Sequence, residues 1–152
     1  MRLMVDTNVL LDALKARRVN AQAARKVLAL GYVGEFDLWV SAGQMKDLTY
    51  FLTDGGKHQL AEQASQTITQ LRQFISFCSL TDADIEEMCR LSWPDLEDSL
   101  VEVAARKVGA EAIVTQNLGD FARSSMLVFD CDGLFDYLAS AKNLTFDVVD
   151  WG

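Results

Sequence analysis

Residues 93–121 read WPDLEDSLVEVAARKVGAEAIVTQNLGDF, a helix, a strand and a polar loop in succession. Apolar residues recur at helical spacing over residues 95–108, between Pro94 and Gly109, which both interrupt helices. Residues 112–115 form a short apolar run that is typical of a buried strand. The stretch therefore predicts a helix that leads into a buried strand, which is the repeating unit of an α/β protein.

The same alternation of short apolar runs and helical periods extends over the rest of the chain. We expect strands over residues 3–5, 37–41, 74–80, 112–115 and 126–129. We expect helices over residues 9–16, 21–30, 44–52, 59–73, 83–91, 95–108 and 134–141, with Gly31 ending the second of them. Strands separated by helices predict an α/β fold with a central parallel sheet covered on both faces.

Length and composition are those of a globular chain. The 152 residues fit one domain, 50% of them are hydrophobic, and the net charge is −8. We expect the domain to span residues 1–143, and residues 144–152 to form a tail that is either a last strand or an exposed partner-binding segment. A surface this acidic repels nucleic acid, so activity on nucleic acid requires a local basic patch or metal ions.

Residue usage also argues against several classes of protein. No apolar run approaches the roughly 18 residues that a membrane helix requires, so we expect no membrane contact. Three scattered cysteines, Cys78, Cys89 and Cys131, fit a reduced, cytoplasmic protein. The single histidine, His58, lies in a polar stretch, which argues against a histidine-based catalytic triad.

Acidic and amide side chains gather near the carboxyl ends of the predicted strands. Ligands of an open parallel sheet bind outside these ends, so we expect at least three carboxylates to converge there. Such carboxylates repel one another unless a divalent cation lies between them. Oxygen ligands without histidine or cysteine suit Mg²⁺ or Mn²⁺. The candidate metal ligands are Asp6, Asp47, Asp95, Asp98, Asn117 and Asp120.

Each of these acids also has a purely structural explanation. Asp6 is a suitable N-cap for the helix that follows it, and Asp95 and Asp98 suit the first turn of theirs. Asp47 is equally acceptable as a solvated helix residue. The acids fall at corresponding ends of different strand–helix units, which favours a shared site.

Three segments together resemble the PIN-domain family, and they cover nearly the whole chain in the family's order. They are MVDTNVLLDAL (4–14), WVSAGQMKDLTYFL (39–52) and the stretch 93–121 quoted above. The ending IVTQNLGDF is similar to the prokaryotic branch that includes VapC-type toxins. The resemblance implies a three-layer α/β/α fold and an Mg²⁺- or Mn²⁺-dependent ribonuclease, the toxin of a toxin–antitoxin system, that hydrolyses RNA phosphodiester bonds.

The resemblance also implies roles for individual residues. Asp6 matches the family's first metal-binding aspartate, and Asp98 matches the acid at the start of the helix before the fourth strand. Asp95 is a nearby acid that assists. The residues expected to hydrogen-bond to the metal ligands are Thr7, Asn8, Ser41 and Thr115.

Two positions depart from the family's pattern. Asp47, expected to be catalytic together with Asp6 and Asp98, stands where the family usually has glutamate, which keeps the charge but shortens the reach. Asn117 stands where many members have the fourth aspartate, and Asp120 is the next available carboxylate.

The expected partners are RNA and protein. Lys15, Arg17 and Arg18, with Arg25 and Lys26 behind them, form a basic cluster that we expect to contact RNA phosphates; the alternative is favourable placement of cations at a helix C-terminus. The resemblance implies an antitoxin that inserts a flexible segment into the acidic groove. It also implies a homodimer, which the apolar residues of 48–52 and 60–74 favour.

Other functions remain as alternatives. The departures at Asp47 and Asn117 suit a PIN domain that has lost catalysis and acts as a binding module. A haloacid-dehalogenase-like phosphatase requires a second aspartate where this chain has Asn8. A response-regulator receiver requires a lysine after its fifth strand, and none follows residues 126–129 directly.

Overall fold

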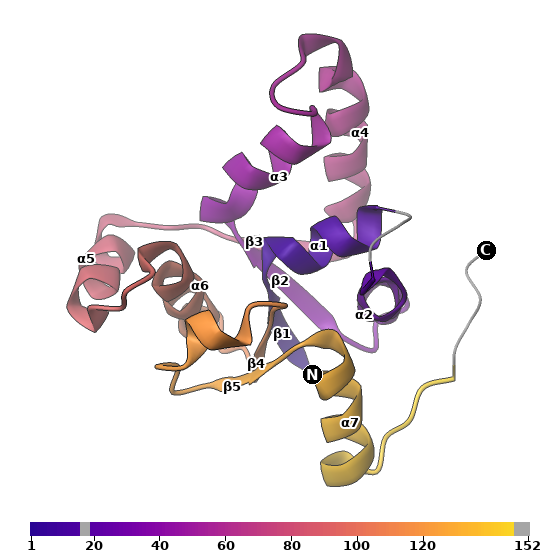
Figure 1. Ribbon diagram of the computed structural model, residues 1–152, viewed down its shortest axis with the longest axis vertical. Helices are drawn as coiled ribbons and strands as arrows, with labels where there is room; N and C mark the ends of the chain where they lie inside the picture. Colours follow the sequence, from indigo (N-terminus) through magenta and orange to yellow (C-terminus); the bar gives the residue numbers. More distant parts are fainter. Residues whose placement is uncertain (16–18, 148–152) are drawn as a thin grey trace.

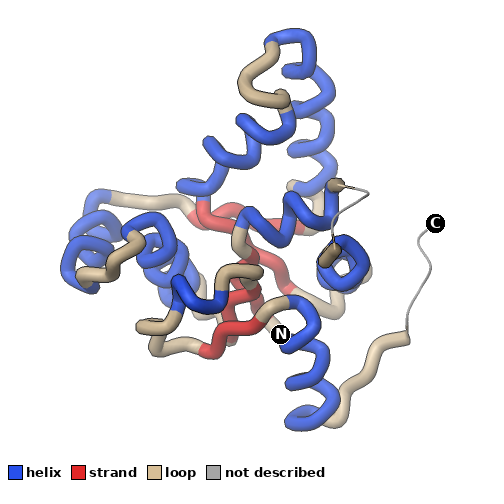
Figure 2. Tube along the Cα trace, viewed as in Figure 1, coloured by secondary structure: helices blue, strands red, loops and turns tan. Residues whose placement is uncertain are grey.

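A computed structural model describes residues 1–15 and 19–147 of the chain. Five parallel strands form one sheet in the order β3-β2-β1-β4-β5, drawn in red at the centre of Figure 2. The strand order reverses beside β1, and ligands bind at such a switch point. The strands are β1 (Arg2–Val5), β2 (Asp37–Ser41), β3 (Ile75–Cys78), β4 (Ala112–Val114) and β5 (Leu127–Phe129).

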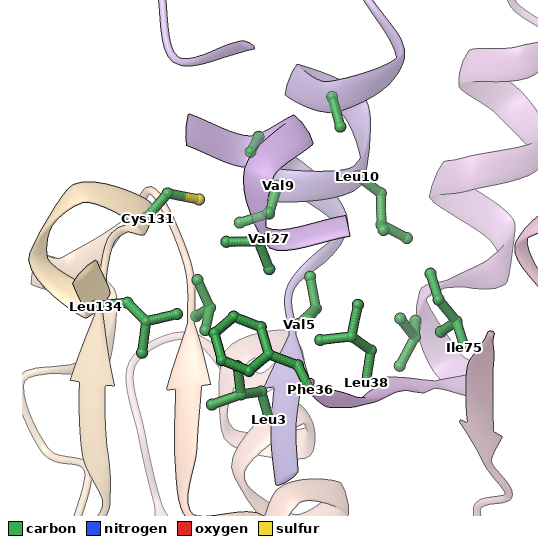
Figure 3. Close-up of a cluster of buried hydrophobic side chains, with 14 of the residues drawn as sticks. Leu3, Val5, Val9, Leu10, Val27, Phe36, Leu38, Ile75, Cys131 and Leu134 are labelled. Atoms are coloured by element: carbon green, nitrogen blue, oxygen red, sulfur yellow. The ribbon is translucent and has the colours of Figure 1, made fainter. Parts of the chain in front are cut away.

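Helices cover both faces of the sheet, because the inner strands are apolar on both faces (Figure 1). Leu3 and Val5 of β1 belong to one buried cluster (Figure 3), whereas Met4 between them belongs to another. The three layers confirm the predicted α/β/α fold. The first cluster lies under α1 (Thr7–Leu14), α2 (Ala21–Tyr32), α3 (Met45–Leu52), α4 (Ala61–Leu71) and α7 (Cys131–Lys142), the second under α5 (Asp82–Leu91) and α6 (Leu96–Lys107).

Gly31 does not end the second helix, contrary to the expectation from sequence. Helix α2 continues through Gly31 to Tyr32, and Gly31 is buried against the sheet. A Cβ atom at position 31 would lie 2.2 Å from Cδ1 of Leu38 on β2. The glycine therefore lets α2 approach β2 closely, and Gly34, with a φ of +85°, follows just beyond the helix.

We expect Gly31→Ala to destabilise the protein by about 1–3 kcal/mol, because the new methyl group forces Leu38 or the helix to move. Denaturant unfolding measures this change. Gly119→Ala is the matched control, since its added methyl meets nothing within 4 Å. Equal stability of Gly31→Ala and the parent protein would show that the contact between α2 and β2 accommodates an added methyl group.

Several helix boundaries lie outside the predicted ranges because of caps and short 3-10 turns. Helix α7 begins at Cys131, since the side chain of Asp130 accepts a hydrogen bond from the Gly133 N–H (2.6 Å). Three 3-10 helices occur in segments assigned to loops or longer helices: η1 (Ala42–Gln44), η2 (His58–Leu60) and η3 (Leu118–Phe121).

The first part of the expected tail packs on the domain. Over residues 144–147 no strand forms, and the Phe146 ring lies 5.8 Å from that of Phe36. Lys26 donates a hydrogen bond to the Phe146 carbonyl (2.8 Å). Residues 148–152 lie outside the described part of the chain. Within residues 1–15 and 19–147, no helix combines the length and apolar character that crossing a membrane requires.

Candidate metal centre

A pocket of about 400 Å³ lies beside the carboxyl ends of β1, β2 and β4, where the sheet topology predicts a ligand site. Its wall is mainly acidic and polar, and among the described residues Lys46 is its single cation. Acidic residues of the wall are Asp6, Asp47, Asp95, Glu97, Asp98 and Asp120; polar neutral residues are Thr7, Asn8, Ser41, Gln44 and Asn117.

Asp6 is held rigidly at the base of this pocket. Its Oδ1 accepts hydrogen bonds from the Thr7 N–H (2.7 Å) and from Nε2 of Gln44 (2.5 Å). Its Oδ2 accepts from Nδ2 of Asn8 (3.1 Å) and from Oγ1 of Thr115 (2.8 Å). Both oxygens are thus oriented by two donors each. Asp6 is only 6% exposed, and this burial raises its pKa although all four donors favour the charged form.

Asp6 therefore does more than cap the helix that follows it. A cap requires one hydrogen bond to a backbone N–H, which Thr7 supplies. Three further side chains, from α1, the end of η1 and the residue after β4, also converge on this carboxylate. This extra support fits a carboxylate that is oriented toward a ligand.

A second group of carboxylates also lines the pocket. Oxygen atoms of Asp95, Asp98 and Asp120 all lie within 4.8 Å of one another. Asp95 is also the N-cap of α6, since its side chain accepts a hydrogen bond from the Asp98 N–H (3.0 Å). Asp120 comes from η3, which follows β4. Two segments of the chain thus bring three negative charges together.

Asp98 shows the electrostatic effect of this arrangement. Its pKa is raised to about 7, mainly by burial and then by the negative charges of Asp6, Asp95, Asp120 and Glu97. A carboxylate with such a pKa is partly protonated at neutral pH. A cation placed among these groups removes the repulsion that raises the pKa.

The donor set fits a hard divalent cation. The three clustered side chains offer carboxylate oxygens only, and no histidine or cysteine of the described residues lines the pocket. Mg²⁺ and Mn²⁺ prefer such ligands. A cation would also reduce the repulsion between Asp98 and the carboxylates around it.

The remaining expected site residues lie in the pocket with different contacts. Asp47 is exposed on the first turn of α3, outside the three-carboxylate cluster. Asn117 is exposed, and its N–H donates to Oγ1 of Thr115 (3.1 Å). Thr7 Oγ1 is buried and has no hydrogen-bond partner among the described residues. Ser41 does not bond to a metal ligand as expected; its Oγ accepts from the Gly43 N–H (3.3 Å) and caps η1.

The basic cluster expected to contact RNA is only partly described. Lys15 lies with its ammonium 4.5 Å from the centre of the Phe51 ring, and it is not among the residues that line the pocket. Arg25 donates to the Ala13 carbonyl near the end of α1 (3.0 Å), which favours the structural interpretation for that residue. Arg17 and Arg18 lie outside the described residues.

Polar residues of the pocket wall that the sequence does not predict include Glu97, Gln44 and Lys46. Gln44 is 9% exposed and donates to Asp6, and Lys46 follows it in the wall of the pocket. The sequence predicts Gln44 and Lys46 as part of a helix over residues 44–52. Both follow Ser41 by about one helical turn, and this spacing is the signal that places them beside the end of β2.

Residues 2–119 match the sequence model of the PIN domain, and the chain belongs to this family. Ribonuclease VapC1 from Aquifex aeolicus (strain VF5) is 26% identical over 121 residues, which are 76% of this chain and 81% of the relative.

Solved structures show the same fold. VapBC-1 from nontypeable Haemophilus influenzae has a TM-score of 0.64 at 17% identity, over 87% of this chain and 99% of that one. Mycobacterium tuberculosis VapC20, described as a sarcin-ricin loop cleaving toxin, has a TM-score of 0.56 at 14% identity, over 73% and 86%.

Proposed function

We propose that this PIN-domain protein is an Mg²⁺- or Mn²⁺-dependent endoribonuclease and the toxin of a VapBC-type toxin–antitoxin pair. The observation that carries the proposal is the pocket lined by Asp6 and by a cluster of three carboxylates, with the pKa of Asp98 raised to about 7. The likeness to a protein named Ribonuclease VapC1 supports RNA as the substrate.

The carboxylates of Asp98, Asp95, Asp120 and Asp6 are the proposed cation ligands. A bound divalent cation lowers the pKa of a coordinated water and shields the charge of the attacked phosphate. The chain's own contribution is orientation: four donors fix the Asp6 carboxylate, and the Asp95 side chain is fixed by the helix it caps. The Asp98 carboxyl group, with its pKa of about 7, would release its proton to solvent on binding a cation.

Cleavage of RNA in the presence and absence of a chelator tests this proposal. We expect purified protein to cut a mixed RNA substrate with Mn²⁺ or Mg²⁺, to stop in excess EDTA, and to recover when Mn²⁺ is restored. Cleavage that continues unchanged in excess EDTA would contradict the metal dependence. Absence of cleavage with either metal, at protein concentrations that saturate the RNA, would contradict the nuclease activity.

Lys46 is the proposed contact to the RNA backbone, because it is the cation in the wall of an otherwise acidic pocket. We expect Lys46→Gln to raise KM several-fold with little change in kcat, and to lower the slope of log KM against log salt by about one unit. Lys57→Gln is the matched control, since Lys57 pairs with Asp54 and does not line the pocket. Equal KM values and salt slopes for the two variants would contradict this role.

An antitoxin is the proposed protein partner in the cytoplasm. A chain with a net charge of −8 and an acidic pocket attracts a basic segment and speeds its association. The similar structures include VapBC2 from Rickettsia felis and VapBC-1 from nontypeable Haemophilus influenzae, and this likeness supports a partner of this kind. We expect co-expression with the neighbouring reading frame to yield a complex; failure to co-purify even at low salt would contradict this partnership.

A homodimer is proposed as well. Helices α3 and α4 pack on each other and extend as a pair beyond the sheet (Figure 1). Tyr50 on α3 is 66% exposed. Sedimentation at tens of micromolar, an order-of-magnitude working concentration, tests this assembly. A monomer of 16.9 kDa at that concentration would contradict it.

A catalytically weakened PIN domain is the second candidate. Asn117, exposed in the wall of the pocket, brings no carboxylate to the site, and this observation favours weaker metal binding. Calorimetry separates the candidates: a binding module has little affinity for Mn²⁺, whereas the proposed nuclease binds it.

A further inference from the structure

A buried carboxylate, Glu102, lies outside the pocket and is not explained by the proposed chemistry. Glu102 is on α6, one helical turn beyond Asp98, and its side chain is fully buried. Its Oε1 forms an ion pair with Arg106 and accepts hydrogen bonds from the N–H and Oγ of Ser125 (both 3.3 Å). Its Oε2 has no partner among the described residues.

Ser125 belongs to the segment that carries Asp120. We call residues 118–126 the connecting segment, because they join β4 to β5 and lie beside α6 (Figure 1). Ser125 also accepts a hydrogen bond from Arg106 (2.8 Å). Glu102, Arg106 and Ser125 therefore form a closed triangle of contacts, which attaches the end of the connecting segment to the helix that carries Asp98.

Two more contacts attach the connecting segment near the start of α6. The Phe121 ring packs edge-on against Trp93, with centroids 5.8 Å apart. Arg123 donates to the Ser92 carbonyl (2.9 Å). Asp120 lies next to these anchors and is exposed, so repulsion from Asp95 and Asp98 pushes it away from the site unless its backbone is held.

Stability alone does not account for the burial of the Glu102 carboxylate, whose partner Arg106 is partly exposed. An apolar pair such as Trp93 and Phe121 already holds the segment, and a buried charge pays a desolvation penalty that its partner often only offsets. Hydrogen bonds and ion pairs depend on direction, whereas apolar packing does not. These contacts therefore fix the position of the connecting segment relative to α6. In metal sites, groups that orient the ligands contribute to affinity without touching the metal.

We propose that Glu102, together with Arg106 and Ser125, is a positioning group that holds Asp120 against Asp95 and Asp98 for cation binding. This inference rests on the proposed function. In this proposal Asp120 supplies the carboxylate that Asn117 does not bring to the site.

Calorimetric titration of the whole metal-free protein with Mn²⁺ tests the proposal. Ser125→Ala removes the hydroxyl that Arg106 and Glu102 contact at an exposed position, so the fold tolerates it. We expect Mn²⁺ binding to weaken about fivefold, the factor that loss of one ordinary hydrogen bond gives. Ser124→Ala is the matched control, because the Ser124 Oγ accepts only from the Met126 N–H within the segment. We expect its affinity to stay that of the parent.

Two backgrounds show whether the effect passes through Asp120. In Asp120→Asn, titrated to millimolar Mn²⁺, Ser125→Ala should cause no further loss, because there is no carboxylate left to position. In Asn117→Asp, the new carboxylate lies shortly after β4 and replaces that of Asp120. The loss of Mn²⁺ affinity caused by Ser125→Ala should therefore shrink. Glu102→Gln should weaken binding in the same direction as Ser125→Ala.

The opposite results overturn the proposal. They are an unchanged affinity for Ser125→Ala, an equal loss for Ser124→Ala, or the same fivefold loss with and without the Asp120 carboxylate. A parent protein that binds no Mn²⁺ would overturn the proposed function together with this inference. If the parent binds Mn²⁺ but the losses from Ser125→Ala and Asp120→Asn simply add, the positioning role alone is overturned.

Discussion

Replacing Asp98 with asparagine is expected to lower RNA cleavage roughly a thousandfold and to raise the melting temperature of the metal-free protein. Activity falls because a charged cation ligand is lost. Stability rises because the charged form of Asp98 is penalised mainly by burial and then by the negative charges of Asp6, Asp95 and Asp120, and its pKa of about 7 reports this penalty. After a discount for solvent screening, we expect a gain of about 1–2 kcal/mol near neutral pH.

Asp6→Asn is the matched comparison, and it separates the ligand role from the structural role. We expect a similar loss of activity but a loss of stability, by about 1–3 kcal/mol, instead of a gain. Each Asp6 oxygen accepts two hydrogen bonds, so an amide nitrogen in place of either oxygen faces donors. Kinetics on RNA and thermal unfolding without metal measure both effects. An Asp98→Asn protein as active as the parent would refute the mechanism.

The second large effect is the pH dependence of metal binding. A proton on Asp98 competes with the cation, so the affinity for Mn²⁺ is expected to fall about tenfold per pH unit below the pKa of about 7. Above that pH the affinity levels off. Titrations from pH 5.5 to 8, a range chosen to bracket the pKa, measure this slope. The Asp98→Asn protein should lose it.

The metal-free protein should show the opposite trend in stability. The pKa of Asp98 is higher in the folded chain than the ordinary value of 3.8, so the folded state binds the proton more tightly. Its contribution to stability is therefore greatest below pH 4 and is lost as the pH rises toward 7.

Mn²⁺ affinity that does not change between pH 5.5 and pH 8 would contradict the assignment of Asp98 as a ligand.

The fold is predictable from the sequence because the local patterns agree with the global arrangement. The runs of β1, β2 and β4 are short and have apolar residues at successive central positions, which is what burial on both faces requires. Gly31 was misassigned because a glycine in a helical pattern suggests a helix end, whereas its reason here is a contact with β2, distant in sequence. Contacts between residues that are distant in sequence produce no pattern in the local sequence.

The candidate site is predictable to a similar degree. Position after a strand predicts that Asp6 lies in the pocket, and position in the first turn of a helix predicts the same for Asp98, because parallel strands bring these ends together. Their roles as metal ligands are implied by the family resemblance. The four-donor environment of Asp6 and the role of Gln44 depend on side-chain directions that only the folded chain fixes. The sequence does not single out Glu102, because an acid on an amphipathic helix usually faces solvent.

The position of a bound cation is the decisive test of the proposed metal centre. Crystals grown or soaked with Mn²⁺ give an anomalous signal that identifies the metal independently of any assay. We predict a single pocket occupied by Mn²⁺, with Asp98 in contact and with Asp6, Asp95 or Asp120 completing the set of protein ligands. Crystals at saturating Mn²⁺ with no anomalous peak in this pocket, or with Mn²⁺ bound only at other residues, would contradict the proposed metal centre.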